Sequence, residues 1–101
     1  MKIVATIEAR MTSSRLPGKV LMEADGKSML SHLVQRLKAV QSIDSICLAT
    51  TVNSTDDALE IFAKDEGIEV FRGSEENVLS RVIGAGEACD ADVVAATLLQ
   101  T

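Results

Sequence analysis

Short apolar runs alternate with segments of helical period along this chain, and this alternation constrains the fold more than any other feature of the sequence. The apolar runs cover residues 2–7, 45–50, 68–72 and 92–96, and the helical segments begin near residues 28, 54 and 78. Strands that alternate with helices form parallel sheets with helices on both faces. Because crossover connections are right-handed, we predict a three-layer α/β fold with strand order 3-2-1-4 and the first strand in the centre.

Local signals mark where the predicted helices begin and end. Ser28 is a suitable N-cap for the first helix, and Gly67 is well placed to end the second in the left-handed conformation. Ser54 and Asp57 resemble a capping box at the start of the second helix. We interpret Asp56 and Asp57 as first-turn acids that favour the helix dipole, in preference to a metal-binding pair.

The third helical segment has an apolar stripe and weakens near Gly84 and Gly86. We expect its inward side to consist of Val78, Leu79, Val82 and Ile83. Arg81 then falls on the side that faces solvent, and a position within reach of a ligand site is the weaker alternative. The core under this helix is therefore expected to be aliphatic.

Composition limits the chain to one small domain. A length of 101 residues is that of a single domain, with 47% hydrophobic and only 2% aromatic residues. The scarcity of aromatic residues removes the stacking platforms of single-stranded nucleic-acid binders, and a formal charge of −5 argues against binding a phosphate backbone. No apolar run approaches the roughly 20 residues that cross a bilayer. We expect neither a nucleic acid nor a membrane as a partner.

Cysteine and histidine show no metal-binding pattern. Cys47 and Cys89 lie far apart in the sequence, and Cys47 sits in an apolar run as a small buried residue would. His32 has no cysteine, aspartate or second histidine at metal-site spacing. These residues predict no metal site, and two reduced thiols without a visible signal peptide suit a cytoplasmic protein.

A basic, hydroxyl-rich segment follows the first predicted strand. Residues 9–22 contain three bases, Arg10, Arg15 and Lys19, and no acid, although the whole chain is acidic. In an open α/β sheet, ligands bind at the carboxyl end of a strand where the strand order reverses, which is here the first strand. Bases and hydroxyls at this place suit an anionic ligand, above all a phosphate chain. The alternative is a surface loop of solvated charges.

The order of residues in this segment is specific. Its sequence is Ala9-Arg10-Met11-Thr12-Ser13-Ser14-Arg15-Leu16-Pro17-Gly18-Lys19. The glycine patterns of P-loops and of dinucleotide-binding folds are absent. The segment resembles the signature A-R-x-x-S-x-R-L-P-G-K of the sugar-activating cytidylyltransferases, which include the spore coat polysaccharide biosynthesis protein F type and the CMP-KDO and acylneuraminate synthetases. Residues 49–51 and 71–79 also look like segments of this family.

This resemblance implies a Rossmann-like sheet of the glycosyltransferase A type and a nucleotidyltransferase activity. Family members transfer CMP from CTP to a sugar or sugar acid and release pyrophosphate, with Mg²⁺, in the biosynthesis of cell-surface polysaccharides. The implied partners are CTP or a related nucleotide and a sugar acceptor. Residues 1–101 would form a single nucleotide-binding domain that is the N-terminal half of the longer family fold.

The resemblance also assigns the phosphate-binding positions. Arg10 and Lys19 would be catalytic residues that hold the triphosphate, with Arg15 in support. Ser13 and Ser14 would offer hydroxyls to phosphate. The chemistry requires positioning and neutralisation of charge more than covalent participation by the protein.

Three further positions are matched to the nucleoside. Ala9 would present its backbone to the base. Ser74 and Asn77 fall in the stretch that reads the pyrimidine and its ribose. For Ser74, a plain role as a helix N-cap is an equal alternative.

The chain departs from the family pattern in two places. The family often has glutamine where this chain has Glu8, and an acid there is expected to repel phosphate or to bind a metal. After the fourth strand the family carries a metal-binding aspartate in a segment like T-G-D-C-P, whereas residues 97–101 contain no acid. Mg²⁺ is thus implied without its usual ligand. The alternative function is a truncated, catalytically inactive module for nucleotide binding or assembly.

The fourth apolar run would lie at the margin of the sheet. A bare, uncharged outer strand is an unusual feature in a natural protein. We therefore predict a homo-oligomer that associates through the fourth strand or the third helix.

Overall fold

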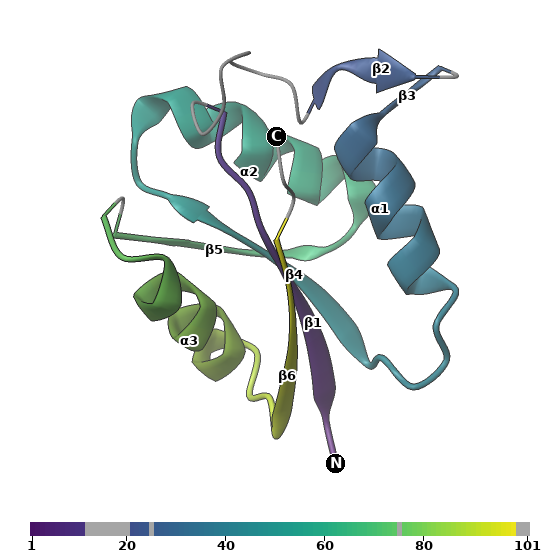
Figure 1. The fold of residues 1–101 in the computed structure, drawn as a ribbon, viewed down its shortest axis with the longest axis vertical. Helices are drawn as coiled ribbons and strands as arrows, with labels where there is room; N and C mark the ends of the chain where they lie inside the picture. The colour runs from purple at the N-terminus through teal and green to yellow at the C-terminus, as the bar shows by residue number, and fades with distance from the viewer. Residues whose placement is uncertain (12–20, 25, 75, 99–101) are drawn as a thin grey trace.

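A parallel four-stranded sheet with helices on both faces forms the core of the molecule (Figure 1). The computed structural model describes residues 1–11, 21–24, 26–74 and 76–98. The sheet consists of β1 (Ile3–Glu8), β4 (Ser45–Thr51), β5 (Glu69–Gly73) and β6 (Val93–Leu98). Their spatial order is β5-β4-β1-β6, and each neighbouring pair is parallel. Counted along the chain this is the order 3-2-1-4, so the predicted fold class is confirmed.

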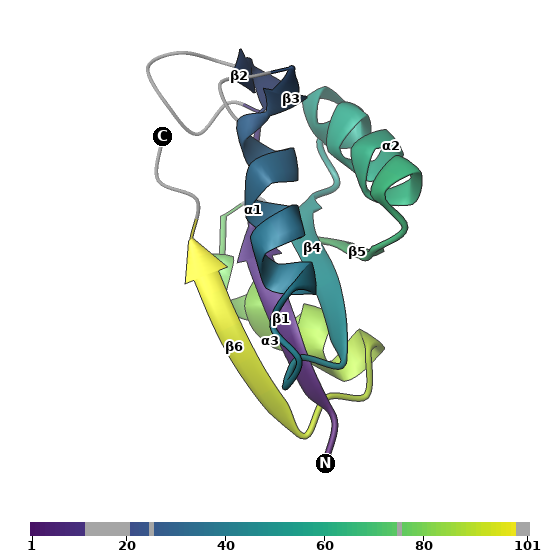
Figure 2. The ribbon, with the colours of Figure 1, turned by 90° about the vertical axis from the view of Figure 1, so that its right-hand side faces the viewer.

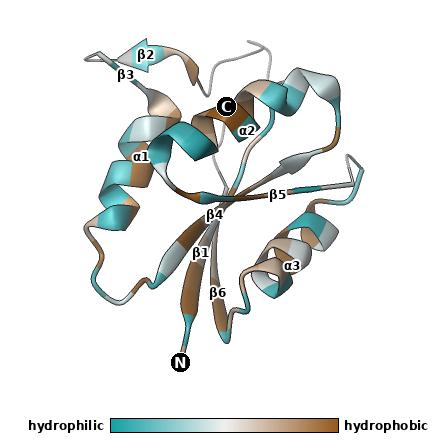
Figure 3. Ribbon diagram, turned by 180° about the vertical axis from the view of Figure 1, so that it is seen from behind, coloured by the Kyte–Doolittle hydropathy of each residue, from teal (hydrophilic) through white to brown (hydrophobic). Residues whose placement is uncertain are grey.

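The helices divide between the two faces of the sheet. Helices α1 (Met29–Lys38) and α2 (Asp57–Glu66) cover one face, and α3 (Val78–Ala88) covers the other (Figure 1). Leu48 packs with the first pair of helices, and Cys47 packs with α3. Both central strands are buried over almost their whole length because each has helices on both sides. The hydropathy colours of Figure 3 show β1 and β4 as largely hydrophobic.

A small hairpin before α1 is a feature that the sequence pattern did not indicate. Strands β2 (Glu23–Ala24) and β3 (Lys27–Ser28) pair antiparallel just before α1. Gly26 lies in the turn with φ of 81°, a conformation that favours glycine. Two-residue strands are too short to show an alternating pattern, so the sequence carries only a turn signal here.

Two of the predicted helix ends are confirmed. The hydroxyl of Ser28 accepts a hydrogen bond of 3.0 Å from the backbone N–H of Ser31, which makes Ser28 the N-cap of α1. Gly67 ends α2 with φ of 73° in the left-handed region. These two signals set the boundaries of α1 and α2 as expected.

The capping box predicted for the second helix is wrong. A 3₁₀ turn, η2 (Ser54–Asp56), precedes α2, and its cap is the side chain of Asn53. The Asn53 Oδ1 accepts hydrogen bonds of 3.0 Å from Thr55 N and 2.9 Å from Thr55 Oγ1. Asn53, and not Ser54, is therefore the capping residue. The helical segment begins with η2, before the first residue of α2.

Helix α3 faces the sheet with a different side from the one predicted. Leu79 and Ile83 are 68% and 50% exposed, whereas Arg81 is fully buried. Ala85 and Gly86 are also buried, so small residues surround the arginine on the inward side. The prediction from the hydrophobic stripe is wrong because it took no account of the short distance between this helix and the sheet. At that distance small residues, not large apolar ones, face the strands.

Two glycines explain the close approach of α3. A Cβ placed on Gly84 would lie 2.5 Å from the ring of Phe71 on β5, and one on Gly86 would lie 2.7 Å from Val94 on β6. Larger residues at these positions would push the helix away from the sheet. The glycines predicted to weaken the helix are thus contact points, and the helix continues through them to Ala88.

The outer strand β6 leaves apolar side chains in contact with solvent. Val93 and Val94 are 43% and 38% exposed, and β6 pairs only with β1 among the described residues (Figure 2). Self-association through this strand stays a prediction. None of the helices in the described ranges has the length and apolar content that a membrane span requires.

The two cysteines are free thiols on the α3 side of the sheet. Cys47 is fully buried on β4, and Cys89 follows the end of α3 in the same cluster. Burial, followed by the influence of Cys89, raises the pKa of the Cys47 thiol to about 12. Cys47 thus serves as the small hydrophobic residue that its position in the sequence predicts.

Helix α2 offers a matched test of the core. Leu59 is fully buried, whereas Ile61 on the same helix is 61% exposed. We expect Leu59→Ala to lower the free energy of unfolding by about 2–5 kcal/mol through lost burial and a residual cavity. Ile61→Ala is expected to change it by about 0.5 kcal/mol or less. Urea unfolding of both variants measures this, and equal losses would contradict the assigned orientation of α2.

Candidate functional site

The carboxyl ends of β1, β4 and β5 meet at one edge of the sheet, here called the carboxyl edge. It includes residues 8–11, 51–53 and 73–74. Of the predicted phosphate-binding residues, four belong to the segment 12–20, which lies outside the described residues. These are Ser13, Ser14, Arg15 and Lys19. The described part of the candidate site therefore consists of residues 8–11, 51–53 and 73–74, and residues 12–20 follow Met11 in the sequence.

Ala9 and Arg10 lie at the carboxyl edge, as the resemblance requires. Ala9 is 3% exposed, and its N–H donates a hydrogen bond of 3.2 Å to the carbonyl of Ala49 on β4. Because the Ala9 N–H already has this partner, the backbone group that Ala9 could offer to a base is its carbonyl. Arg10 follows directly and is partly exposed to solvent.

Ser74 and Asn77 lie in the connection between β5 and α3. Asn77 is the N-cap of α3, because its Oδ1 accepts a hydrogen bond of 3.0 Å from Ser80 N. Ser74 is exposed, and its hydroxyl accepts a bond of 3.3 Å from Glu76 N. The alternative that Ser74 caps the helix is therefore wrong. The structure places Ser74 at the carboxyl edge, where it faces solvent, and Asn77 three residues further on, at the start of α3.

A buried ion pair lies directly beneath this connection. The Arg81 Nη2 donates to Glu8 Oε1 at 2.6 Å, and Arg81 Nη1 donates to the carbonyl of Ser74 at 2.6 Å. The side chains of Arg81 and Glu8 are 0% and 9% exposed. The expected solvent-facing position of Arg81 is wrong, because Glu8 and Ser74 hold the guanidinium inside. The acid at residue 8 thus has a fixed positive partner.

The sequence did contain a signal for this pair. Side chains alternate along a strand, so Val4 and Glu8 face the same side of β1. Val4 packs in the cluster that α3 covers, together with Ala85. Arg81 lies one helical turn before Ala85, and both therefore face the sheet. The signal becomes readable only once the side of α3 that faces the sheet is known.

Asp56 is a buried anchor for the segment after β1. It is 1% exposed, and its Oδ1 accepts a hydrogen bond of 2.8 Å from the backbone N–H of Met11. The hydroxyl of Thr51 donates to its Oδ2. Interpretation of Asp56 as a plain first-turn acid is therefore incomplete, because its carboxylate joins the ends of β1 and β4.

Arg72 on β5 holds the other side of the same edge. Its Nε donates to Thr51 O at 2.6 Å and its Nη2 to Asn53 O at 2.7 Å. Its Nη1 donates to Asp57 Oδ1 at 2.8 Å and to Glu60 Oε1 at 3.0 Å. These carboxylates, Asp57 foremost, raise the pKa of Arg72. One guanidinium thus fixes the residues that follow β4.

Two buried carboxylates, Glu8 at the carboxyl edge and Asp56 beside it, already have partners, Glu8 through Oε1 alone. Glu8 binds Arg81, and Asp56 accepts hydrogen bonds with both of its oxygens. Within the described ranges no group of three or more His, Cys, Asp or Glu residues is placed to hold a metal ion. Mg²⁺ is usually held by one or two carboxylates together with substrate phosphates, so an Mg²⁺ site shared with a bound nucleotide stays a proposal.

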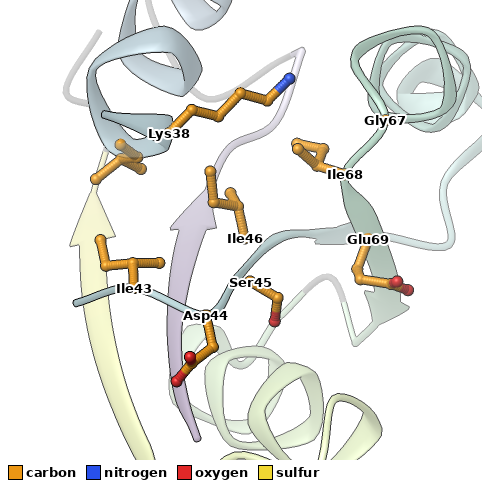
Figure 4. A pocket seen from close by; sticks show the side chains of 9 residues that line it. Lys38, Ile43, Asp44, Ser45, Ile46, Gly67, Ile68 and Glu69 are labelled. Carbon is orange, nitrogen blue, oxygen red and sulfur yellow. The ribbon is translucent and has the colours of Figure 1, made fainter. Parts of the chain in front are cut away.

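A cavity of about 270 Å³ lies at the opposite edge of the sheet (Figure 4). The lining residues are Leu37, Lys38, Ile43, Asp44, Ser45, Ile46, Gly67, Ile68 and Glu69. Helices α1 and α2 end here, so their negative dipole ends point toward it. Asp44 and Glu69 add two acids to one base, Lys38. A polyphosphate is disfavoured in these surroundings, which leaves the carboxyl edge as the candidate site.

The fold is an open α/β sheet, and in such sheets ligands bind at the carboxyl ends of the strands where the strand order reverses. Comparison with known proteins gives the family. A family model described as cytidylyltransferase matches residues 4–100, and the chain belongs to this family.

Three similar proteins place the chain within the family. The spore coat polysaccharide biosynthesis protein SpsF of Bacillus subtilis is 41% identical over 96 residues, which cover 91% of this chain and 40% of that protein. A cytidylyltransferase from Leptospira borgpetersenii superposes with a TM-score of 0.90 and 33% identity over 97% of this chain and 41% of that chain. A CMP:2-keto-3-deoxy-manno-octonic acid synthetase complexed with CTP superposes with a TM-score of 0.75 and 29% identity, over 97% of this chain and 40% of that chain. The chain thus spans well under half the length of these relatives.

Removal of the Asp56 carboxylate tests its role as an anchor. Asp56→Ala would leave the Met11 N–H and the Thr51 hydroxyl without their acceptor, at a cost of about 1–3 kcal/mol in the free energy of unfolding. We also expect faster hydrogen exchange of the Met11 amide. Asp65→Ala, an exposed acid on α2, is the control. Equal effects of the two substitutions in urea unfolding would contradict the role assigned to Asp56.

The ion pairs of Glu60 predict a pH dependence. Hydrogen bonds from Arg72 and then from Lys64 lower the pKa of Glu60 below its usual value of 4.5. A carboxyl group with a lowered pKa stabilises the fold above the unfolded pKa, and this stabilisation is lost as the pH falls through the folded value. Wild type should therefore exceed Glu60→Gln in stability at pH 7, and the difference should vanish in acid below pH 4.5.

Thermal unfolding of wild type and Glu60→Gln from pH 7 to pH 3 measures this difference. Glu87→Gln, which removes an exposed acid on α3, is the control for the loss of a surface charge. A difference for Glu60→Gln that is unchanged across the range would contradict the assignment.

Proposed function

We propose that this chain forms the CTP-binding part of a cytidylyltransferase that transfers CMP to a sugar or sugar acid and releases pyrophosphate. The place of this reaction is the biosynthesis of cell-surface polysaccharides. Membership of the cytidylyltransferase family supports the reaction class. The similarity to a spore coat polysaccharide biosynthesis protein and to a sugar acid synthetase supports the kind of acceptor.

One observation carries the proposal for CTP. Almost the whole chain, 97%, superposes on a synthetase that was solved with CTP. At the carboxyl edge of this chain, Arg10 follows the central strand and is partly exposed, while Ser74 faces solvent from the neighbouring connection. This arrangement leaves a cationic group and a polar group at the edge where α/β sheets bind ligands.

The proposed reaction is a displacement at phosphorus. An oxygen of the acceptor forms a bond to the α-phosphorus of CTP, the bond from that phosphorus to the bridging oxygen breaks, and pyrophosphate leaves. The acceptor hydroxyl loses its proton to solvent. Negative charge builds up on the leaving group, so positively charged groups that are already in place lower the barrier.

Within this proposal Arg10 and Lys19 are the catalytic residues that contact the triphosphate. Arg15, Ser13 and Ser14 are further contacts to phosphate. A guanidinium such as that of Arg10 suits this task, because its planar fork donates two parallel hydrogen bonds to phosphate oxygens.

The remaining positions are proposed to contact the nucleoside. Ala9 offers its carbonyl to the base, and Ser74 and Asn77 lie toward the ribose. Mg²⁺, when bound, would neutralise phosphate charge.

Titration with nucleotides tests the proposal. A ligand at about one hundred times its Kd stabilises the folded state by about 2.7 kcal/mol, which corresponds to roughly 10–20 degrees in Tm for a domain of this size. We expect such a shift with CTP and a smaller one with UTP, ATP or GTP. Equal shifts with all four, or none with any, would contradict CTP as the ligand.

The matched variants are Arg10→Ala and Arg36→Ala. Loss of a charged hydrogen-bond donor costs about 1.5–3 kcal/mol, so Arg10→Ala should weaken CTP binding by roughly 10- to 100-fold. Arg36 is exposed on α1 and serves as the control. Release of pyrophosphate in the presence of sugar acids separates the transferase from a module that binds nucleotide without catalysis.

A further inference from the structure

Two loops of the carboxyl edge are joined by one buried side chain. The guanidinium of Arg81 reaches Glu8 through Nη2 and the carbonyl of Ser74 through Nη1, each at 2.6 Å. Glu8 is the last residue of β1, and Ser74 is the first residue after β5. Arg81 itself has no exposed surface. A single buried guanidinium thus connects the end of β1 with the residue that follows β5.

No ladder of the sheet provides this connection. In the order β5-β4-β1-β6, strand β4 separates β1 from β5. The backbone hydrogen bonds therefore couple each of these strands to β4 and not to one another. Among the described contacts, Arg81 is the group that ties the end of β1 directly to the residue after β5.

Stability alone is a poor reason for such a pair. The desolvation of two charges commonly offsets their attraction, and an apolar pair of similar volume often serves as well. Glu8 Oε2 is also buried and has no hydrogen-bond partner in the described part of the chain. A buried acceptor without a hydrogen-bond partner lowers the stability of the fold, because it has lost its contact with water. The pair is therefore expected to provide a defined geometry more than a gain in stability.

We propose that the pair of Glu8 and Arg81 is a positioning device for the nucleotide site. It fixes the spacing between the segment that begins at Ala9 and the connection that contains Ser74 and Asn77. It also neutralises the acid beside the phosphate-binding segment. This inference rests on the proposed function, because its purpose is to hold two sets of nucleotide contacts at the correct separation.

A double replacement separates geometry from stability. Arg81→Met or Glu8→Leu alone leaves a buried charge without its partner, so each is expected to unfold at lower urea concentration. The combination of both substitutions removes both charges and should return the urea midpoint toward the wild-type value. It should still bind CTP about tenfold or more weakly, because the two loops lose their fixed spacing. Full recovery of both stability and affinity would overturn the proposal.

Conservative variants keep the test decisive where the double variant folds poorly. Arg81→Lys keeps the charge and removes the fork, so it should bind CTP about tenfold more weakly than wild type. Within the Glu8 series, Glu8→Gln should restore most of the affinity lost in Glu8→Leu, since its amide oxygen still accepts from Arg81. Lys64→Met, which removes an exposed ion pair on α2, is the control. Arg81→Lys with wild-type affinity would overturn the proposal.

Hydrogen exchange of the free protein distinguishes failure of this inference from failure of the proposed function. A wild type that does not bind CTP would refute the function and leave the coupling to be measured without ligand. Arg81→Lys should then accelerate exchange at both Ala9 N–H and Ser80 N–H, which lie on the two sides of the bridge. Acceleration at one side alone, or at neither, would overturn the coupling.

Discussion

The pairing of β1 with β4 on one side and with β6 on the other determines where every other element lies. A strand with parallel neighbours on both sides must be covered on both faces, and this places α1 and α2 opposite α3. The same pairing brings the ends of three strands to one edge, directly after the central strand. The basic segment of the sequence leaves the sheet at this point. The position of the candidate site is thus a consequence of strand order.

Three charged side chains form hydrogen bonds with residues of the carboxyl edge. Arg81 joins the end of β1 to the start of the connection after β5, Asp56 joins the segment after β1 to β4, and Arg72 fixes the residues that follow β4. Each of these three side chains bonds to at least one backbone group: Arg81 to Ser74 O, Asp56 to Met11 N, and Arg72 to the carbonyls of Thr51 and Asn53. Side chains that bond to backbone in this way set the course of the loops at the edge. These hydrogen bonds connect the segments that follow β1, β4 and β5 at the carboxyl edge.

The sequence predicted the parts of the fold that depend on local patterns. Continuous apolar runs identified the strands, and the caps Ser28 and Gly67 marked helix ends, because these signals arise from neighbouring residues. The side of α3 that faces the sheet depends on how closely the helix approaches, which its own stripe does not reveal. The burial of Arg81 depends on Glu8, 73 residues away, and that of Asp56 on Met11, 45 residues away. Contacts over such distances cannot be recognised from local propensity, so the candidate site was located by motif while its support was missed.

The partnership of β1 with β6 also affects how the protein is made. Residues 2 and 92 come together across the start of these strands, where Lys2 N donates to Asp92 Oδ2 at 2.7 Å. On the ribosome, β1 emerges some 90 residues before its outer neighbour, a delay of several seconds at about 5–20 residues per second. Throughout that interval the central strand has one side open to the surroundings of the nascent chain. Closure of the sheet on this side of β1 therefore waits until β6 has been synthesised.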